Sequence, residues 1–182
     1  MTSSTITFAG GPIFDGTELR EGYAARFRNG VLDALAPLDQ IAQDDRIEDL
    51  HGDILSPGYA DLQVNGGGGV MFNDDPSVHT LTQIARAHRA LGATRILPTL
   101  ITDTAEKTRA AIDAAIKAVQ TGVSGIAGLH LEGPHLSERR KGAHDAALIR
   151  PMQQTDQEIL IDAAKHLPAS MVTLAPESPT LQ

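Results

Sequence analysis

From residue 57 onward, the chain alternates between short apolar runs with the period of a strand and longer amphipathic runs with the period of a helix. This alternation constrains the fold more than any other feature. The predicted strands cover residues 59–65, 94–101, 124–132 and 171–175, and the predicted helices cover 77–91, 104–122 and 155–167. The inward stripe of the first helix is predicted to run from Val78 to Leu91, and a capping box of Thr155 and Glu158 marks the start of the third. This order is typical of βαβ units on a parallel sheet.

Four strands and three helices are half of what a closed (β/α)8 barrel contains, and such a barrel typically needs about 250 residues. The alternative is a complete, small, open α/β sheet. That alternative gives no reason for a β-module in front of the sheet, or for a last strand without a covering helix. We therefore predict an α/β fold in which residues 57–182 form the N-terminal half of a (β/α)8 TIM-type barrel.

Residues 1–56 are predicted to form a small β-sandwich module, which is incomplete. Residues 5–8 alternate as a strand does, and Asn29-Gly30 joins predicted strands at 23–28 and 31–35 in the strongest short hairpin signal of the chain. Further short strands are predicted at 46–50 and 53–55. A few short strands bury little apolar surface by themselves. The module therefore needs partner strands or a neighbouring domain.

The composition excludes several classes of protein. A net charge of −8 over 182 residues argues against nucleic acid or an anionic membrane as the main partner. The chain has no cysteine, which excludes disulfides and thiolate metal ligands. Residues 1–16 do not have the pattern of a signal peptide, and no apolar stretch approaches the roughly 20 residues of a membrane helix. We expect a cytoplasmic protein.

The stretch GLHLEGPHLSERRKGAH, residues 128–144, carries most of the candidate chemistry. On a strand, His130 and Glu132 share one face and the leucines between them take the other. A carboxylate at the C-terminal end of a barrel strand suits a metal or catalytic site. Glu132 is a candidate metal ligand, with pairing to Arg139, Arg140 or Lys141 as the alternative. His130 is a candidate site residue, with a packed histidine as the alternative.

The first strand after residue 57 ends in polar residues. Asp61, Gln63 and Asn65 are predicted to share one face of it. The amide oxygens of Gln63 and Asn65 are poor zinc ligands beside imidazole or carboxylate. A metal site that relies on this strand is therefore weak or absent, and the alternative role of these residues is to line the site by hydrogen bonding.

The loop after Glu132 holds the only basic cluster of an acidic chain, Arg139-Arg140-Lys141. A positive patch beside a candidate site suits an anionic small molecule such as a sugar phosphate, and a solvated loop is the alternative. His144 is expected to donate to a substrate hydroxyl or carbonyl. The glycine run 66–69 is expected to be a flexible turn rather than an anion site. Five histidines are expected at surface or loop positions without a chemical role: His51, His79, His88, His135 and His166.

Three motifs in order along the chain carry a resemblance to a known family. They are LSPGYADLQVNG at 55–66, ILPTLIT at 96–102, and the stretch at 128–144. Together they resemble the N-acetylglucosamine-6-phosphate deacetylases of the amidohydrolase superfamily, and the similarity extends through VTLAPE at 172–177. The Gln-x-Asn pattern at 63–65 resembles the branch of the family that uses a single metal ion.

The resemblance implies hydrolysis of N-acetylglucosamine 6-phosphate to glucosamine 6-phosphate and acetate, in amino-sugar catabolism. It implies one divalent ion as cofactor, zinc first and iron, cobalt or manganese as alternatives. Glu132 would be the metal ligand, Ala143 and His144 would bind the substrate, and Gln63, Asn65 and His130 would line the site. The family's catalytic aspartate and two further metal-binding histidines are expected beyond residue 182.

The resemblance also sets what the chain is expected to do by itself. Without those groups, we expect a truncated form with little or no activity. Residues 178–182 depart from the family's helical continuation, as a truncated or frameshifted reading frame would. A half-barrel exposes apolar surface and open strand edges, so a homo-oligomer is expected. The alternatives are another amidohydrolase acting on a cyclic or linear amide, and a non-enzymatic fragment.

Overall fold

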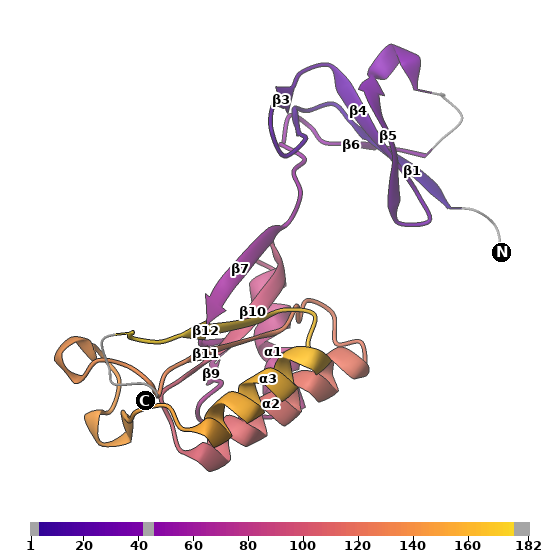
Figure 1. The fold of residues 1–182 in the computed structure, drawn as a ribbon. Coiled ribbons are helices and arrows are strands. Elements are labelled where there is room, and N and C mark those ends of the chain that lie inside the picture. Colours follow the sequence, from indigo (N-terminus) through magenta and orange to yellow (C-terminus); the bar gives the residue numbers. More distant parts are fainter. Residues whose placement is uncertain (1–3, 42–45, 177–182) are drawn as a thin grey trace. The chain divides into compact units, whose positions relative to one another are not determined.

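A computed structural model describes residues 4–41 and 46–176 of the chain. The expectation for residues 178–182 lies outside these described residues. The contacts divide the chain into two compact units, Met1–Pro57 and Gly58–Gln182. Each unit is visible in the ribbon of Figure 1, and each has its own sheet and its own core.

The first unit contains a four-stranded sheet in the order β5-β4-β1-β6. Its strands are β1 (Thr5–Ala9), β4 (Tyr23–Arg28), β5 (Val31–Pro37) and β6 (Arg46–Asp49), with β2 (Ile13–Phe14) and β3 (Leu19–Arg20) pairing separately. The predicted hairpin is present, because Asn29 and Gly30 both have positive φ, 52° and 79°, as a type I′ turn requires. The predicted strand at 53–55 is not: Leu55 makes only a single bridge to Ile13.

The core of this unit is small. Its buried cluster consists of Ala9, Ala24 and Ile41, with Ala36 packed against it. The rings of Phe8 and Phe27 meet edge to face, 5.7 Å apart. Small side chains bury little apolar area, so this unit gains limited hydrophobic stabilisation within its own boundary.

The second unit is an α/β layer built on a parallel sheet in the order β12-β11-β10-β7. The strands are β7 (Tyr59–Val64), β10 (Ala93–Ile101), β11 (Leu129–Glu132) and β12 (Ser170–Thr173). Between them lie α1 (Val78–Arg89), α2 (Ala105–Gln120) and α3 (Gln154–His166), together with short strands β8 (Gly66–Gly67) and β9 (Val70–Met71) and the 3-10 turns Glu138–Arg140 and Ala146–Leu148. The parallel pairing follows from the strand–helix alternation of the sequence.

Local sequence explains where the helices begin. Ser77 and Thr104 cap α1 and α2, because their hydroxyls accept from the backbone N–H of Thr80 and Lys107. The predicted start of α3 was wrong by two residues: its N-cap is Gln153 and not Thr155, and the Gln153 backbone N–H donates to the Asp156 carboxylate at 2.8 Å. The prediction for Leu91 was also wrong, because α1 ends before it and Leu91 is 79% exposed.

The core of this unit lies between the sheet and its helices, and α2 and α3 run side by side below the strands in Figure 1. Leu81 and Ile84 of α1 are fully buried, and Leu129 and Leu131 of β11 join the same cluster. A fully buried side chain of this size stabilises the fold by about 1.5–3 kcal/mol. This face of β11 is therefore committed to packing, which leaves its other face for chemistry.

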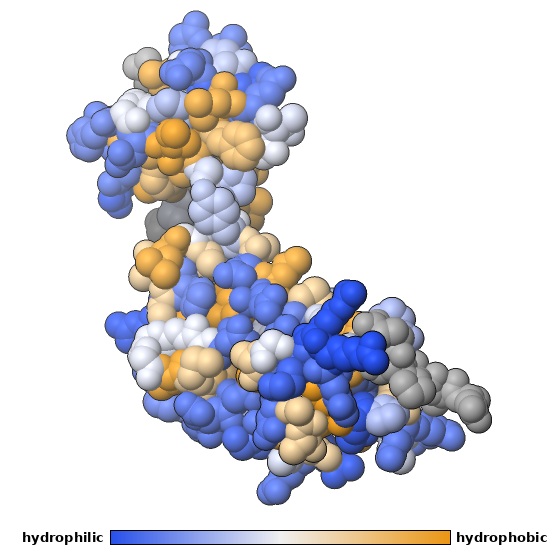
Figure 2. Space-filling view, turned by 90° about the vertical axis from the view of Figure 1, so that its left-hand side faces the viewer, coloured by the Kyte–Doolittle hydropathy of each residue, from blue (hydrophilic) through white to orange (hydrophobic). Residues whose placement is uncertain are grey.

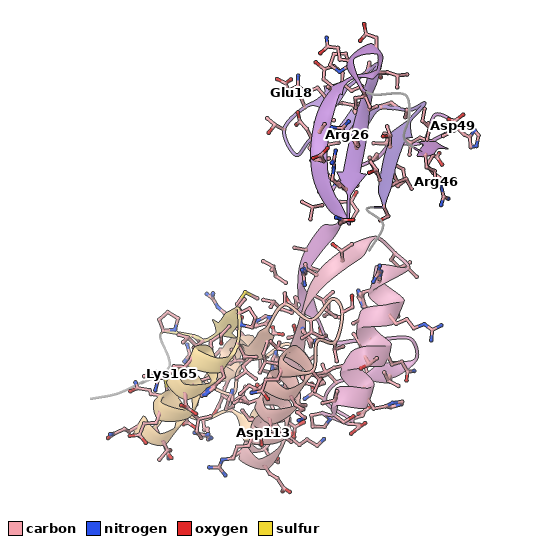
Figure 3. All side chains as sticks on the ribbon, turned by 90° about the vertical axis from the view of Figure 1, so that its right-hand side faces the viewer. Glu18, Arg26, Arg46, Asp49, Asp113 and Lys165 are labelled. Carbon is pink, nitrogen blue, oxygen red and sulfur yellow. The ribbon has the colours of Figure 1, made fainter. Side chains whose placement is uncertain are left out.

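The outer sides of α2 and α3 carry charged side chains. Figure 3 places the labelled side chains of Asp113 and Lys165 on the outer sides of α2 and α3, and both residues are exposed. In the described part of the chain, none of the helices has the length and apolarity that crossing a membrane requires.

Candidate functional site

Glu132 lies at the last position of β11, and its carboxylate is the centre of the site. Gln63 of β7 donates from Nε2 to Glu132 Oε2 at 3.0 Å. His144, from the loop that follows β11, places Nε2 3.6 Å from Glu132 Oε1. Residues that are distant in the sequence thus meet at the carboxyl end of the parallel sheet, where α/β enzymes place their active sites.

A cavity of about 730 Å³ opens above this carboxylate. Seven of the residues that the sequence singles out line it: Gln63, Asn65, Glu132, Arg140, Lys141, Ala143 and His144. The rest of its lining comes mainly from the segments that follow β11 and β12. The loop that follows β11 lies on the left-hand side of Figure 1, and Figure 2 shows the molecule from that side. In that view, the surface of the Gly58–Gln182 unit is mostly hydrophilic with scattered apolar side chains.

Asp61 does not join Gln63 and Asn65 in this cavity. The pairing of β7 with β10 shifts register between Asp61 and Val64, which breaks the simple alternation along the strand. Asp61 Oδ1 accepts from the backbone N–H of Gln63 at 3.1 Å, and Asp61 Oδ2 lies 4.0 Å from His88 of α1. The prediction that all three residues share one face was therefore wrong for Asp61.

His130 lies beneath the cavity and not in its lining. Its ring is 1% exposed and hydrogen-bonds at Nδ1 with Thr99 Oγ1, 3.2 Å, and at Nε2 with Thr173 Oγ1, 2.8 Å. Burial lowers the pKa of His130 below its usual value, although the nearby Glu132 charge acts in the opposite direction. A neutral imidazole with both ring nitrogens occupied is a structural support for the strand ends.

Thr102 is the site residue that sequence reasoning missed. It follows β10, is 6% exposed, and contacts His144 Nδ1 through Oγ1 at 2.8 Å. Thr99 and Thr173 were missed in the same way. Threonine is common in strands for its branched side chain, so no signal in the sequence separates these hydroxyls from ordinary strand residues.

The basic cluster divides between cavity and solvent. Arg140 and Lys141 line the cavity, and Arg139 does not. Lys141 also stabilises the loop, because its Nζ donates to the carbonyl of His144 at 3.2 Å. The two cavity-lining cations offer a binding position for an anionic group beside the Glu132 carboxylate.

The glycine run is a packed hairpin, not the expected flexible turn. Gly66 and Gly67 pair with β9, and Gly68 and Gly69 form the turn with positive φ. His88 Nε2 bonds the Gly66 carbonyl at 2.9 Å, and Gln83 Nε2 donates to the Gly68 carbonyl at 2.7 Å. These contacts fix the hairpin on α1.

A second cavity, of about 300 Å³, lies on the helix side of the sheet between α2, α3 and the loop after β11. Two of its charged groups pair with each other, because the Arg150 guanidinium makes two hydrogen bonds of 2.6 Å to Asp156. His135, expected at the surface or in a loop, lies in the loop but is 3% exposed, and its ring bonds the Arg150 carbonyl at 3.0 Å. The Arg150 guanidinium holds the pKa of Asp156 at about 2.

The oxygen and nitrogen donors around Glu132 are fewer than a catalytic metal ion needs. Catalytic zinc ordinarily takes three protein ligands. Among residues 4–41 and 46–176, no group of three or more His, Asp or Glu side chains is placed to hold a metal ion. At this position Glu132 offers one anionic oxygen and Gln63 a neutral amide, so the described residues do not form a complete metal site.

Comparison with known proteins identifies relatives of this chain. No family model matches the chain. The N-acetylgalactosamine-6-phosphate deacetylase of Shewanella sp. (strain ANA-3) is 47% identical over 126 residues, which are 69% of this chain and 32% of that protein. The N-acetylglucosamine-6-phosphate deacetylase of Haemophilus influenzae is 31% identical over 169 residues, 93% of this chain and 44% of that protein.

Solved structures give the same result. The N-acetylglucosamine-6-phosphate deacetylase of Pasteurella multocida superimposes with a TM-score of 0.90 at 33% identity, over 97% of this chain and 46% of that chain. A mutant of the Mycobacterium smegmatis enzyme, in complex with N-acetyl-D-glucosamine-6-phosphate, gives 0.83 at 28% identity, over 98% of this chain and 45% of that chain.

These matches first define a class: the α/β fold corresponds to the N-terminal part of amidohydrolase deacetylase structures. The chain belongs to the family of N-acetylglucosamine-6-phosphate and N-acetylgalactosamine-6-phosphate deacetylases. It spans between about a third and less than half of the length of these relatives.

Proposed function

We propose that this chain supplies part of the active site for deacetylation of an N-acetylhexosamine 6-phosphate, giving the hexosamine 6-phosphate and acetate. The observation that carries the proposal is the meeting of Gln63, Glu132 and His144 in one cavity with Arg140 and Lys141. An anionic ligand, a hydrogen-bonding imidazole and a cationic patch are the groups that a phosphorylated amide substrate needs.

Each residue has a distinct proposed role. Arg140 and Lys141 bind the 6-phosphate through charge-assisted hydrogen bonds. His144 donates to a sugar hydroxyl or to the acetyl carbonyl, and the backbone at Ala143 contacts the sugar. Gln63 orients the Glu132 carboxylate, Asn65 lines the same wall, and His130 supports the strands beneath.

Glu132 is proposed as one ligand of a divalent metal ion. Because the described residues contain one anionic ligand at this position, the other ligands and the general base are proposed to come from residues outside them. The identity of the metal, with zinc first, stays a prediction.

The finer description of the fold is also a proposal. The four parallel strands with helices on one face are consistent with the first half of a (β/α)8 barrel, residues 57–182, and the sheets of residues 1–56 with a small β-sandwich module. Homo-oligomerisation and a cytoplasmic location remain predictions.

The epimer of the substrate is the main alternative within this function. The relative from Shewanella carries the name of a galactosamine enzyme at 47% identity, whereas the Haemophilus relative, at 31%, carries that of a glucosamine enzyme. The two sugars differ in the orientation of one hydroxyl group, so both are carried as candidate substrates.

The test is binding of the product to the 182-residue chain by calorimetry. Glucosamine 6-phosphate and galactosamine 6-phosphate are compared with their unphosphorylated sugars. We expect saturable binding of at least one phosphorylated sugar and at least about tenfold weaker binding of its unphosphorylated form, because a charge-assisted contact is lost. Equal binding of the two forms would remove the role assigned to the basic loop.

A further inference from the structure

The imidazole of His144 is held from its Nδ1 side by a single residue. Thr102 contacts Nδ1 twice: its backbone N–H donates to Nδ1 at 3.4 Å, and its Oγ1 lies 2.8 Å away. The other ring nitrogen, Nε2, faces the Glu132 carboxylate at 3.6 Å. The ring therefore has a different environment on each nitrogen.

The neighbours of Thr102 fix its position. It is 6% exposed, and its hydroxyl lies so close to Gly133 that any Cβ at residue 133 would collide with it. Gly133 has a φ of +90°, a conformation that other residues rarely adopt. The Thr102 hydroxyl also lies 3.4 Å from the Glu132 carbonyl oxygen. Thr102 thus stands between the ends of β10 and β11 and the loop that carries His144.

These contacts discriminate between the two neutral forms of the ring. A backbone N–H is always a donor, so its contact with Nδ1 requires a lone pair there. The carboxylate of Glu132 accepts only, so it favours a proton on the nitrogen that faces it. With a proton on Nδ1, its hydrogen would oppose the backbone N–H of Thr102, and the lone pair on Nε2 would oppose those of the Glu132 carboxylate. The Thr102 hydroxyl can donate or accept, so it is compatible with either form of the ring.

We propose that Thr102 positions the His144 ring so that, as the Nε2–H tautomer, it presents a fixed hydrogen-bond donor to the cavity. That this donor meets a substrate oxygen rests on the proposed function, whereas the tautomer and the orientation of the ring do not. Thr102 is a positioning residue, since it touches His144 and does not line the cavity.

The experiment uses nitrogen-15 chemical shifts of the histidine rings in the 182-residue chain, recorded at rising pH until the shifts no longer change and the rings are neutral. The His144→Gln variant identifies the His144 signals by their loss. The shifts of the two ring nitrogens show which of them carries the proton. We expect the proton on Nε2, and a proton mainly on Nδ1 would overturn the proposal.

Two variants test the role of Thr102 itself. Thr102→Val keeps a similar shape but removes the hydroxyl, and we expect the nuclear Overhauser contacts between residue 102 and the His144 ring to be lost or averaged. Thr102→Ser keeps the hydroxyl and should retain them. Thr108→Val is the matched control, because the Thr108 hydroxyl on α2 bonds only the Thr104 carbonyl.

The outcomes separate the positioning role from the fold and from the function. Thermal unfolding of each variant shows that the chain is folded at the temperature of measurement. If Thr102→Val is folded and leaves the His144 ring contacts unchanged, the positioning role is contradicted. Because this readout needs no sugar, failure of the sugar-binding experiment contradicts the proposed function and leaves the Thr102 result intact.

Discussion

Gln63 and Glu132 are 69 residues apart in the sequence and are joined by a 3.0 Å hydrogen bond across the carboxyl end of the sheet. The pair places a neutral amide directly beside the candidate metal ligand. The amide orients the carboxylate but adds little affinity for a zinc-class metal.

The variant Gln63→His tests this interpretation of the pair. An imidazole near Glu132 would provide a second ligand, so we expect zinc affinity to rise by about tenfold or more, as measured by competition with a chromogenic chelator. Gln63→Ala is the control and should not strengthen binding. An unchanged zinc affinity in Gln63→His would show that residue 63 does not face a metal position.

The basic loop offers a charge test with a control built into the same cluster. Lys141→Ala removes a cation that lines the cavity, and Arg139→Ala removes one that does not. We expect Lys141→Ala to weaken binding of hexosamine 6-phosphate by about three- to thirtyfold, since a charge-assisted contact in a solvated cavity is lost, and Arg139→Ala to change it by less than about twofold. Equal losses in the two variants would indicate a diffuse charge effect instead of a defined phosphate position.

The Arg150–Asp156 pair predicts a pH dependence of stability. The pKa of Asp156 is lowered from 3.8 to about 2, chiefly by its hydrogen bonds to Arg150. A carboxyl group with a depressed pKa in the folded state stabilises the fold above its unfolded pKa of 3.8, and this stability is lost as the pH falls toward 2. Allowing for partial exposure, we expect Asp156→Asn to lower the free energy of unfolding by about 1–2 kcal/mol at neutral pH.

Urea unfolding at neutral pH and at successively lower pH gives the measurement. The difference between wild type and Asp156→Asn should shrink through the window between the two pKa values. Asp113→Asn, an exposed aspartate on α2, is the matched control and should show little difference. A difference that stays constant down to the folded pKa would mean that the carboxylate charge does not contribute.

Gly128 is predicted to be required for the pairing of β11 with β12. A Cβ at this position would collide with the backbone carbonyl of Ala169, whose oxygen accepts from Leu129 N at 3.2 Å. We expect Gly128→Ala to destabilise the unit by about 2–4 kcal/mol in chemical denaturation, as overpacking against backbone does. Gly69→Ala is the comparison: its φ is +86° with open space around it, so it should cost about 1 kcal/mol of strain. Equal losses would contradict the close packing at Gly128.

The sequence predicts the elements of the second unit well where periodicity and caps act locally. Ser77 and Thr104 precede helices whose inward residues follow the 3.6 period, and β11 alternates between core and site faces. The start of α3 was missed because Gln153 is not a usual N-cap residue. Its partner Asp156 also accepts a hydrogen bond from Arg150, which lies outside the helix. Leu91 was wrongly assigned to the buried stripe because its spacing fits the helical period, whereas α1 ends at Arg89 and Ala90 caps it.

The site was predicted in part. Strand alternation places Glu132 above His130, and the loop's chemistry singles out Lys141 and His144. The register shift beside Asp61 is a property of strand pairing, which the period of one strand does not contain. The role of Thr102 depends on its contact with His144, which lies 42 residues later in the sequence. Only the three-dimensional arrangement reveals this contact.

The most direct test of the central claim is zinc binding to the 182-residue chain and to its Glu132→Gln variant by equilibrium dialysis. With one anionic ligand at the site, the wild type should bind zinc weakly, and Glu132→Gln should weaken that binding by about tenfold or more. Tight stoichiometric zinc binding that is unchanged in Glu132→Gln would contradict the assignment of Glu132 as the metal ligand that this chain contributes.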